Sequence, residues 1–248
     1  MVFSGIIQCR GRIENVMESN SQAGRTFVIR PESESFLGKS VSVGSSISVD
    51  GVCLTVTELD DHVFRVDVAP ETLKRTHFSS IVLGDAVNLE NALQMSDRNS
   101  GHTVQGHVDG VGKIVSVIPD GISLRFTIST RSISLESTAR SSMNALIVPK
   151  GFIAVDGASL TVCEVNRVEE WFTLMLIPHT QAVLKPWQVG QFVNLELDCL
   201  AKYVTASLEG YLAPVIEKLR FRSQMSEVIA VASMGVSILC LTKLLARR

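Results

Sequence analysis

Two related stretches of the chain carry different polar side chains at matching positions. Residues 46–58 read Ser-Ile-Ser-Val-Asp-Gly-Val-Cys-Leu-Thr-Val-Thr-Glu, and residues 152–164 read Phe-Ile-Ala-Val-Asp-Gly-Ala-Ser-Leu-Thr-Val-Cys-Glu. Cys53 therefore corresponds to Ser159, and Ser46 to Phe152. Two similar sites that hold similar molecules but treat them differently would produce this pattern, with the Cys53 thiol as a candidate nucleophile. The alternative is drift in a core strand. The local residues favour drift, because a lone cysteine is usually a small buried hydrophobic residue.

Two histidines lie in the segment between these stretches. Residues 96–110 read Ser-Asp-Arg-Asn-Ser-Gly-His-Thr-Val-Gln-Gly-His-Val-Asp-Gly, which places His102 and His107 beside glycines. Glycine lets a ligand approach the backbone closely, and an imidazole changes its charge near neutral pH. This segment is therefore a candidate ligand contact. The alternative is a turn that holds two surface histidines.

The two stretches belong to a duplicated domain. Gly51 and Gly157 are 106 residues apart, and the Val-Asn-Leu-Glu runs at Asn88 and Asn194 keep the same offset. A repeat that holds its register in an early and a late segment is a duplication, since chance matches do not keep phase. A further pair of motifs, Pro-Glu-Thr at residue 70 and Pro-His-Thr at residue 178, is 108 residues apart. The second copy has therefore gained two residues before this point and lost two after it.

Each copy has the pattern of several short strands. Runs rich in Val, Ile, Phe and Thr alternate with turn signals, and residues 64–68 alternate apolar and polar side chains as a half-buried strand does. About six such runs per copy, with no long helical period, predict two small closed barrels. Closure removes the edges that an open sheet would expose. The predicted fold is all-β: two tandem similar six-stranded antiparallel Greek-key barrels, at residues 1–103 and 104–199, with C-terminal α-helices.

The hydrophobic period changes after Asp198. Apolar residues then follow the spacing of one helix face, at Leu200, Val204, Leu208, Tyr211, Val215 and Leu219. Pro214 disfavours a helix interior, so residues 200–222 form one kinked helix or two shorter ones, and association between subunits would bury the apolar face. Residues 223–248 are an apolar extension whose uncharged run, 228–242, would reach ~22 Å as a helix, less than the ~30 Å of a bilayer core. We expect this run to pack on the oligomer or the barrels, with membrane contact as the alternative.

The composition argues against several classes of function. A net charge of −2 and an aromatic content of 6% do not suit a nucleic-acid-binding surface. Five cysteines without a Cys-x-x-Cys spacing argue against a disulfide framework and against a structural zinc site. The Walker, GxGxxG, HExxH and GxSxG motifs do not occur in the sequence. No basic region precedes a long apolar core at the N-terminus, so we expect a cytoplasmic protein.

Five motifs in combination resemble those of the riboflavin synthase family. They are residues 3–8 (Phe-Ser-Gly-Ile-Ile-Gln), 50–56 (Asp-Gly-Val-Cys-Leu-Thr-Val), 70–73 (Pro-Glu-Thr-Leu), 100–110 (Ser-Gly-His-Thr-Val-Gln-Gly-His-Val-Asp-Gly) and 150–162 (Lys-Gly-Phe-Ile-Ala-Val-Asp-Gly-Ala-Ser-Leu-Thr-Val). The resemblance covers residues 1–208. It implies a transferase, working without metal or organic cofactor, in which two molecules of 6,7-dimethyl-8-ribityllumazine exchange a four-carbon unit. The products would be riboflavin and 5-amino-6-(ribitylamino)uracil.

The resemblance also implies an assembly. Each barrel would bind one lumazine, and a homotrimer would be held by the C-terminal helices. The active site would lie between the N-terminal barrel of one subunit and the C-terminal barrel of its neighbour. Lumazine synthase would be a further partner.

Residue roles follow from the same resemblance. Ser46, Cys53 and His107 would be the polar groups at the reacting face of the first barrel, with His107 moving a proton and Cys53 or Ser46 adding to a lumazine or hydrogen-bonding it. Lys150 and Asp198 would be the corresponding catalytic groups of the second barrel. The first ligand site would be lined by Gly5, Ile6, Ile7, Cys53, Leu54, Thr55, Asp67, Val68, Ala69, Pro70, Glu71, Thr72, Gly106, His107 and Val108. The second would be lined by Lys150, Ser159, Leu160, Thr161, Ile177, Pro178, His179, Thr180 and Asp198.

The chain departs from the family pattern in three places. Val2 is inserted before Phe3, residues 181–187 replace a threonine-rich turn, and the extension at 223–248 has no counterpart. The alternative function is a non-catalytic lumazine- or flavin-binding protein of the same fold. The enzyme is favoured because the polar residues expected in both barrels are present. A reductase with a similar barrel would carry a nucleotide-binding α/β domain, for which the sequence has no pattern.

Overall fold

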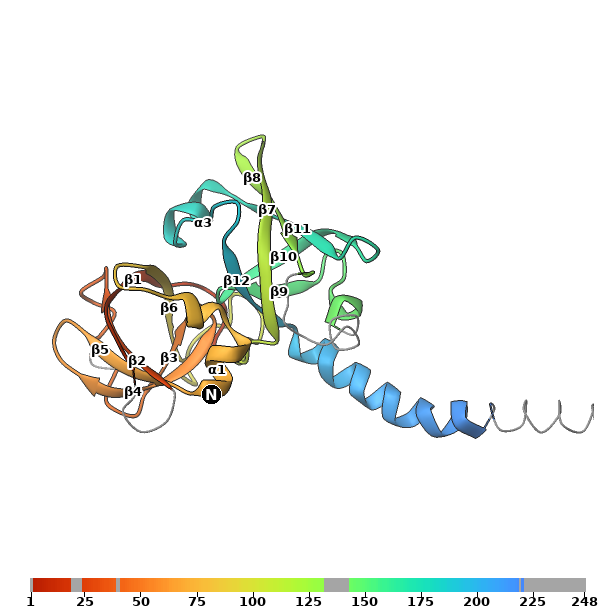
Figure 1. Ribbon diagram of the computed structural model, residues 1–248, viewed down its shortest axis with the longest axis horizontal. Helices are drawn as coiled ribbons and strands as arrows, with labels where there is room; N and C mark the ends of the chain where they lie inside the picture. Colours follow the sequence, from red (N-terminus) through yellow and green to blue (C-terminus); the bar gives the residue numbers. More distant parts are fainter. Residues whose placement is uncertain (1, 19–23, 39–40, 132–142, 219, 221–248) are drawn as a thin grey trace, which may run out of the picture. The chain divides into compact units, whose positions relative to one another are not determined.

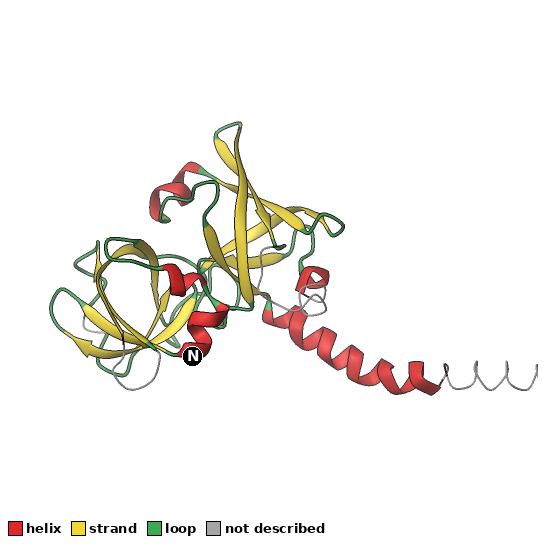
Figure 2. Cartoon of the chain, in the orientation of Figure 1, coloured by secondary structure: helices red, strands yellow, loops and turns green. Residues whose placement is uncertain are grey.

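The computed structural model describes residues 2–18, 24–38, 41–131, 143–218 and 220. Residues 1–201 form one compact unit, and the chain from residue 202 onward forms a second. The first unit contains two barrels (Figures 1 and 2). The predicted apolar extension at 223–248 lies outside the described residues.

The first barrel closes from six antiparallel strands. In barrel order they run β1-β2-β5-β4-β3-β6, and β6 pairs with β1 to complete the ring. Their bounds are β1 Cys9–Glu18, β2 Arg25–Pro31, β3 Ser46–Val49, β4 Val52–Leu59, β5 Phe64–Val68 and β6 Ala86–Asn91.

The second barrel repeats this topology strand for strand. Its ring is β10-β11-β8-β7-β12-β9. Read from β7 in the opposite direction, this ring is β7-β8-β11-β10-β9-β12, which is the order of the first barrel with six added to each label. The bounds are β7 Gly110–Asp120, β8 Ser123–Ser129, β9 Phe152–Val155, β10 Ala158–Asn166, β11 Trp171–Leu176 and β12 Phe192–Leu197. The predicted fold of two similar antiparallel six-stranded barrels is therefore confirmed.

Alternation along the strands creates a separate core in each barrel. In β5, Phe64, Val66 and Val68 are buried whereas Arg65 and Asp67 point outward. Residues buried in this way form one apolar cluster per barrel. Because side chains of a strand alternate between its faces, the outward positions of the same strands are free to form a site.

Short helices follow corresponding strands in the two barrels. Helix α1 (Pro70–Arg75) follows β5, and helix α3 (Pro178–Val183) follows β11, each with proline in its first turn. A 3₁₀ turn, η1 (His77–Ser80), comes after α1. Both α1 and α3 begin at the Pro-x-Thr motifs of the sequence. Proline is common at the first position of a helix, where its missing N–H has no intrahelical acceptor in any case, and this was the signal for α1 and α3.

The segments that lead into the barrels are exchanged between them. Residues 3–7 precede the first barrel, yet Ile7 belongs to the apolar cluster of the second. Residues 104–108 precede the second barrel, yet Val108 packs against the cluster of the first. A β-bridge between Phe3 and Val104 joins the two segments where they cross.

Residues 199–218 form one helix that continues through Pro214. The carbonyl left without a donor by Pro214 is that of Gly210, and both residues are exposed, so water can satisfy it. The structure therefore has one helix here and not the two shorter helices that the sequence also allowed. Among the described residues, none of the helices combines the length and the hydrophobicity that crossing a bilayer requires.

Candidate functional site

The outer face of β4 and β5 carries the predicted polar residues of the first barrel. The pairing of Val56 with Val66 places Thr55 opposite Asp67 on the outward side of the two strands. Thr55 and Asp67 are exposed. Cys53, two residues before Thr55 on the same face of β4, is half-buried. Asp67 accepts a hydrogen bond from the Thr26 hydroxyl at 2.6 Å.

The segment 104–108 crosses this face at Cys53. The Cys53 N–H donates to the Gly106 carbonyl at 2.9 Å. A Cβ atom at Gly106 would come within 2.5 Å of the Cys53 Cβ, and the φ of Gly106 is +77°. Glycine is therefore required here by both contact and conformation. The next residue along the segment, His107, is exposed.

Ser46 lies on β3, the strand that pairs with β4. It pairs with Thr55 across β3 and β4, but it is 5% exposed. The structure thus brings Cys53 and the His107 segment together at the surface, with Ser46 on the adjoining strand.

The second barrel repeats the geometry with the other segment. The Ser159 N–H donates to the Gly5 carbonyl at 2.7 Å. A Cβ at Gly5, whose φ is +73°, would come within 2.6 Å of the Ser159 Cβ. The prediction that Gly5, Ile6 and Ile7 line the first site is therefore corrected, since Gly5 and Ile7 contact the second barrel. A sequence repeat identifies the two segments but does not tell which barrel each one covers.

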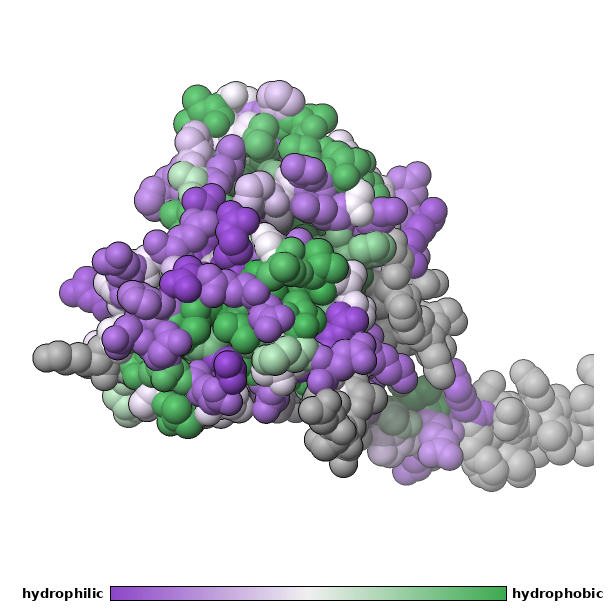
Figure 3. Space-filling view, turned by 60° about the vertical axis from the view of Figure 1, so that its left-hand side comes forward, coloured by the Kyte–Doolittle hydropathy of each residue, from purple (hydrophilic) through white to green (hydrophobic). Residues whose placement is uncertain are grey.

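Exposed residues surround Ser159 on the outer face. Thr161 and Phe152 are paired across β10 and β9, and Phe152 is 48% exposed. Ile6 and Ile177 are 46% and 51% exposed. Pro178, His179 and Thr180 form the first turn of α3 beyond them. Over one face of the molecule, Figure 3 shows hydrophobic residues mixed with hydrophilic ones.

Lys150 and Asp198 have defined backbone roles. Lys150 is exposed with a φ of +64°, and its N–H donates to the Val162 carbonyl at 2.8 Å. The Asp198 carboxylate accepts the N–H of Leu200 at 2.9 Å, so it caps the start of the helix at 199–218.

Four predicted ligand contacts have buried side chains. Ile7, Leu54, Val68 and Leu160 belong to the barrel cores and are 8%, 6%, 1% and 9% exposed. Only their backbone groups are available to a ligand on the outer face. Four further predicted ligand contacts lie in α1 or directly before it and are exposed or half-buried: Ala69, Pro70, Glu71 and Thr72.

Two buried glutamates that the sequence analysis did not assign hold the crossing segments. Glu90 accepts the Ser4 N–H at 2.7 Å and the Gly5 N–H at 3.0 Å. Glu196 accepts the Gln105 N–H at 2.7 Å and the His107 N–H at 2.9 Å. Burial raises the pKa of Glu90, and the hydrogen bonds from Ser4 and Gly5 act against this. The repeated Val-Asn-Leu-Glu run was the signal for this pair, because its glutamate recurs in a buried strand.

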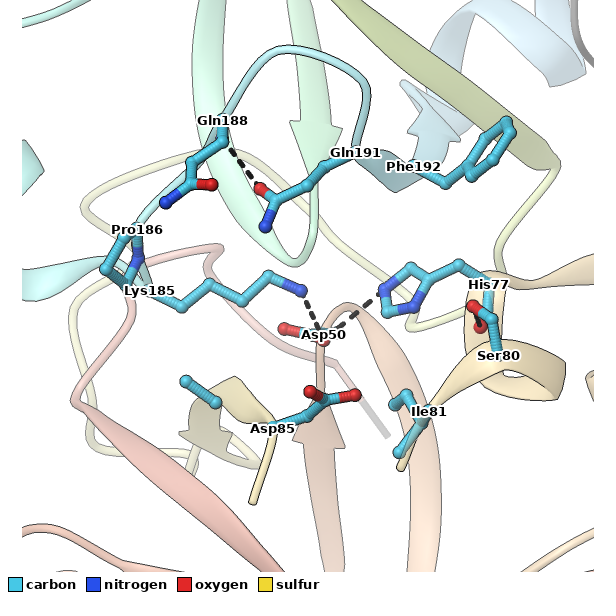
Figure 4. A pocket seen from close by; sticks show the side chains of 11 residues that line it. Asp50, His77, Ser80, Ile81, Asp85, Lys185, Pro186, Gln188, Gln191 and Phe192 are labelled. Atoms are coloured by element: carbon cyan, nitrogen blue, oxygen red, sulfur yellow. Dashed lines mark hydrogen bonds and ion pairs between the residues drawn. The ribbon is translucent and has the colours of Figure 1, made fainter. Parts of the chain in front are cut away.

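A cluster of four charged side chains lies where the two barrels meet, and Figure 4 shows three of them, Asp50, His77 and Lys185. The Lys185 ammonium is 2.6 Å from an oxygen of Asp50 and 3.0 Å from one of Asp156. The His77 Nε2 is 3.3 Å from a carboxylate oxygen of each aspartate. Both aspartates are fully buried. Two carboxylates with an ammonium and an imidazolium form a neutral set, which is the condition for keeping buried charges stable.

Protonation of this cluster follows from its neighbours. Burial and the Lys185 ammonium lower the pKa of His77, but Asp156 and Asp50 outweigh them and raise it to about 9. Burial disfavours the charge on Lys185, yet the same carboxylates raise its pKa. His77 is therefore charged at neutral pH.

A cavity of about 430 Å³ opens beside the cluster, lined by Asp50, His77, Ser80, Ile81, Asp85, Ala86, Lys185, Pro186, Gln188, Gln191 and Phe192. It contains none of the predicted site residues. Asp50, His77 and Asp156 have the spacing of metal ligands. We assign no metal to them because the Lys185 ammonium already occupies the position between the carboxylates.

Both halves of the chain match a known protein family. The family model of the lumazine binding domain matches twice, at residues 4–92 and 105–198. Riboflavin synthase of Schizosaccharomyces pombe is 36% identical over 219 residues, which cover 88% of this chain and 99% of that protein. The chain belongs to the riboflavin synthase family.

Other members of the riboflavin synthase family come from bacteria. Riboflavin synthase of Bacillus subtilis is 35% identical over 82% of this chain and 88% of its own length. That of Mycobacterium bovis is 39% identical over 82% of this chain and 96% of its own length. The resemblance to the riboflavin synthase family inferred from five motifs is confirmed.

The riboflavin synthase fold is also found in LumP. A crystal structure of LumP complexed with 6,7-dimethyl-8-(1'-D-ribityl)lumazine has a TM-score of 0.65 and 20% identity, covering 79% of this chain and 98% of LumP. A complex of LumP with riboflavin has a TM-score of 0.66 and 21% identity, with the same coverage. At this identity the likeness concerns the fold alone.

Proposed function

We propose that the chain is a riboflavin synthase, which transfers a four-carbon unit between two molecules of 6,7-dimethyl-8-ribityllumazine. The products are riboflavin and 5-amino-6-(ribitylamino)uracil. The observation that carries this proposal is the similarity to riboflavin synthases, at 36% identity over 99% of the S. pombe protein's length. A lumazine-binding repeat in each barrel supplies the two substrate sites that such a reaction needs.

The outer faces of the two barrels provide suitable binding surfaces. On the second barrel, Ile6, Phe152 and Ile177 offer exposed apolar area beside the Ser159 hydroxyl. A flat heterocycle can stack on apolar side chains while hydroxyl and backbone groups bind its edges. We assign the second lumazine to this face and the first to the face of Cys53, Thr55 and Asp67.

The residues of the first barrel suit the proton transfers of the reaction. The reaction removes a proton from the acidic 7-methyl group of one lumazine and adds a nucleophile to the other. We assign proton transfer to His107, because it is exposed on the segment whose Gly106 contacts Cys53, and an imidazole can both accept and donate a proton. Cys53 or Ser46 is assigned the nucleophilic or hydrogen-bonding role.

Lys150 and Asp198 are assigned to the second site as polar contacts of the substrate. Lys150 is exposed near Thr161, since its N–H bonds the Val162 carbonyl. Asp198 caps the helix through one carboxylate oxygen. Holding the two lumazines face to face would supply much of the rate enhancement through proximity.

We propose further that the protein is a homotrimer whose active sites form between subunits. Two observations support this. The outer faces to which we assign the two substrates are exposed within one chain. The helix at 199–218 presents an exposed apolar stripe, formed by Leu200, Tyr203, Val204, Leu208, Tyr211, Leu212, Val215 and Ile216. Association with lumazine synthase and a cytoplasmic location stay predictions from the sequence.

A cofactor-free incubation of the purified protein with 6,7-dimethyl-8-ribityllumazine tests the function. We expect riboflavin to appear at one molecule for every two lumazines consumed, measured by its absorbance. Lumazine binding without conversion would contradict the enzyme and support the alternative, a non-catalytic lumazine- or flavin-binding protein.

A further inference from the structure

Two differences between the sequence copies meet at one histidine. Ser159 stands where the first copy has Cys53, and Phe152 stands where it has Ser46. In the structure, the Ser159 hydroxyl is 2.7 Å from Nδ1 of His102. The Phe152 ring is stacked on the His102 ring, with centroids 5.1 Å apart and an interplanar angle of 9°. Both substitutions thus contact His102, which the function described above does not use.

His102 is held in a fixed orientation. It is 7% exposed, and its N–H donates to the Ser4 carbonyl at 3.2 Å. The preceding Gly101 leaves no room for a side chain, since a Cβ there would come within 2.1 Å of the same carbonyl. A buried ring that is stacked on one side and hydrogen-bonded at Nδ1 keeps one rotamer.

The hydrogen-bonding pattern selects one tautomer of His102. Burial lowers the pKa of His102, with Asp198 acting in the opposite direction, so the ring is neutral. Its Nε2 is buried without a hydrogen-bond partner among the described residues. A buried N–H without an acceptor is rare in native structures, so the proton belongs on Nδ1 and the lone pair on Nε2. Nδ1–H then donates to Ser159, and the hydroxyl proton of Ser159 is free to point elsewhere.

The first barrel has no equivalent arrangement among the described residues. Gly5 contacts Ser159 in the same way as Gly106 contacts Cys53, so the two crossing segments correspond at an offset of 101 (106 − 5). The β-bridge between Phe3 and Val104 has the same offset. The counterpart of His102 at this offset is Met1, which lies outside the described residues. The histidine is thus specific to the second barrel.

We propose that His102 is a positioning residue that directs the Ser159 hydroxyl as a hydrogen-bond donor toward the ligand of the second barrel. Phe152 supports the ring, Nδ1–H engages one lone pair of Ser159, and the serine proton faces the ligand's acceptor atoms. The first barrel presents the thiol of Cys53 at the same place, a weaker donor. The two otherwise similar sites therefore hold the same molecule in chemically different ways, as a reaction between two identical substrates requires.

The inference rests on the proposed function, and a double-mutant cycle tests it in the full chain. We expect His102→Leu and Ser159→Ala each to lower kcat/KM roughly threefold to tenfold, the range of one neutral hydrogen bond. The double variant should be no worse than Ser159→Ala alone, because His102 acts through Ser159. His102→Asn, which keeps an N–H near the position of Nδ1, should recover most of the loss. Effects that multiply in the double variant, or a His102→Asn variant as impaired as His102→Leu, would overturn the proposal.

A spectroscopic measurement keeps the test independent of turnover. In the ¹⁵N-histidine-labelled protein, with the His102 signals assigned by their loss in His102→Asn, we expect a proton on Nδ1 and none on Nε2. A proton on Nε2 would mean that Ser159 donates to the ring, and would refute the proposal even in an active enzyme. If the wild type binds lumazine without converting it, the proposed function is wrong but the role of His102 is not yet contradicted. The double-mutant cycle is then carried out with lumazine affinity in place of kcat/KM. If His102→Leu fails to fold, the activity of His102→Asn and the tautomer of His102 in the wild type still test the proposal.

Discussion

At the level of single residues, the two barrels share their backbone contacts and differ in their side chains. Cys53 and Ser159 both donate a backbone N–H to a glycine carbonyl of the crossing segment, at 2.9 and 2.7 Å. The side-chain groups beyond that bond are a thiol in one barrel and a hydroxyl paired with His102 in the other. Two sites with one frame and different donors suit a reaction in which two copies of one molecule have different fates.

Removing the polar groups of the first barrel should affect turnover more than binding. We expect Cys53→Ser and His107→Gln each to lower kcat by about 10²-fold or more, the typical contribution of general acid–base catalysis, and to leave lumazine binding within a few-fold of the wild type. Steady-state kinetics and a fluorescence titration measure the two effects. Cys163→Ser is the matched control, because Cys163 lies in β10 of the second barrel, away from both residues. Full turnover in both variants would show that the first-barrel assignment is wrong.

The charge on His77 links stability to pH. Its pKa is raised to about 9 in the folded protein, against an ordinary value near 6.5. A raised pKa contributes stability that is complete below about pH 6.5 and is lost as pH rises toward 9. The loss is on the order of 2–3 kcal/mol. Urea unfolding at pH 6 and pH 9 should show this decrease in the wild type and a smaller one in His77→Gln.

An exposed histidine provides the control for that experiment. His62 lies in a turn at the surface, so His62→Gln should lose as much stability between the two pH values as the wild type does. Equal losses in His77→Gln and His62→Gln would contradict the assignment of a charged, buried His77.

At the level of elements, the junction of the two barrels is built from matching turns. Gly51 and Gly157 sit at corresponding positions between β3 and β4 and between β9 and β10, with φ values of +80° and +81°. A Cβ at Gly51 would lie 2.6 Å from the Gly157 backbone nitrogen. Asn88 and Asn194 complete the junction, since each side-chain amide donates to the carbonyl of the aspartate in the other barrel. The backbones of the two turns are therefore in direct contact.

Alanine at Gly51 should destabilise the protein beyond the conformational penalty. Gly44 also has a positive φ, +90°, but no atom lies within 4 Å of its Cβ position. Gly44→Ala should cost about 1–2 kcal/mol for the left-handed conformation alone. Gly51→Ala should cost about 1–3 kcal/mol more, because the turn of the other barrel must shift. Chemical denaturation measures both variants, and equal losses would show that the junction tolerates the added methyl group.

At the level of the whole molecule, the apolar stripe of the helix at 199–218 has no cover among the described residues. Leu208 and Val215 are 54% and 44% exposed and share a face with Leu200, Val204 and Tyr211. Such a stripe is typical of a helix that packs against other helices. This is the structural support for the proposed homotrimer.

A charge on the stripe should therefore dissociate the assembly. We expect the wild type to have three times the mass of the chain by light scattering, and Leu208→Glu to have a lower mass and to lose activity. Ala206→Glu, which places the same charge on the opposite side of the helix, should keep the wild-type mass. A monomeric wild type, or a Leu208→Glu variant of unchanged mass and activity, would contradict the proposed assembly.

The sequence alone was enough to predict two similar barrels of six antiparallel strands, and the resemblance to the family supplied the predicted site residues. A constant offset between two copies requires two similar folds, and alternation along short strands requires outward and inward faces. For Cys53 the local residues favoured a core position, whereas the structure leaves this residue half-buried against the crossing segment. The motifs also identified the family, because five of them occur in the right order and spacing.

The sequence could not predict which crossing segment covers which barrel. The exchange that carries Gly5 and Ile7 to the second barrel depends on contacts between residues about 150 apart, such as Gly5 with Ser159, and local periodicity contains no such information. The same holds for His77 and Lys185, which occupy corresponding positions 108 residues apart (185 − 77) and approach the same two aspartates only because the barrels face each other. The role of His102 likewise became visible only once Ser159 and Phe152 were placed around it. Long-range packing, which no single stretch of sequence encodes, determines these contacts.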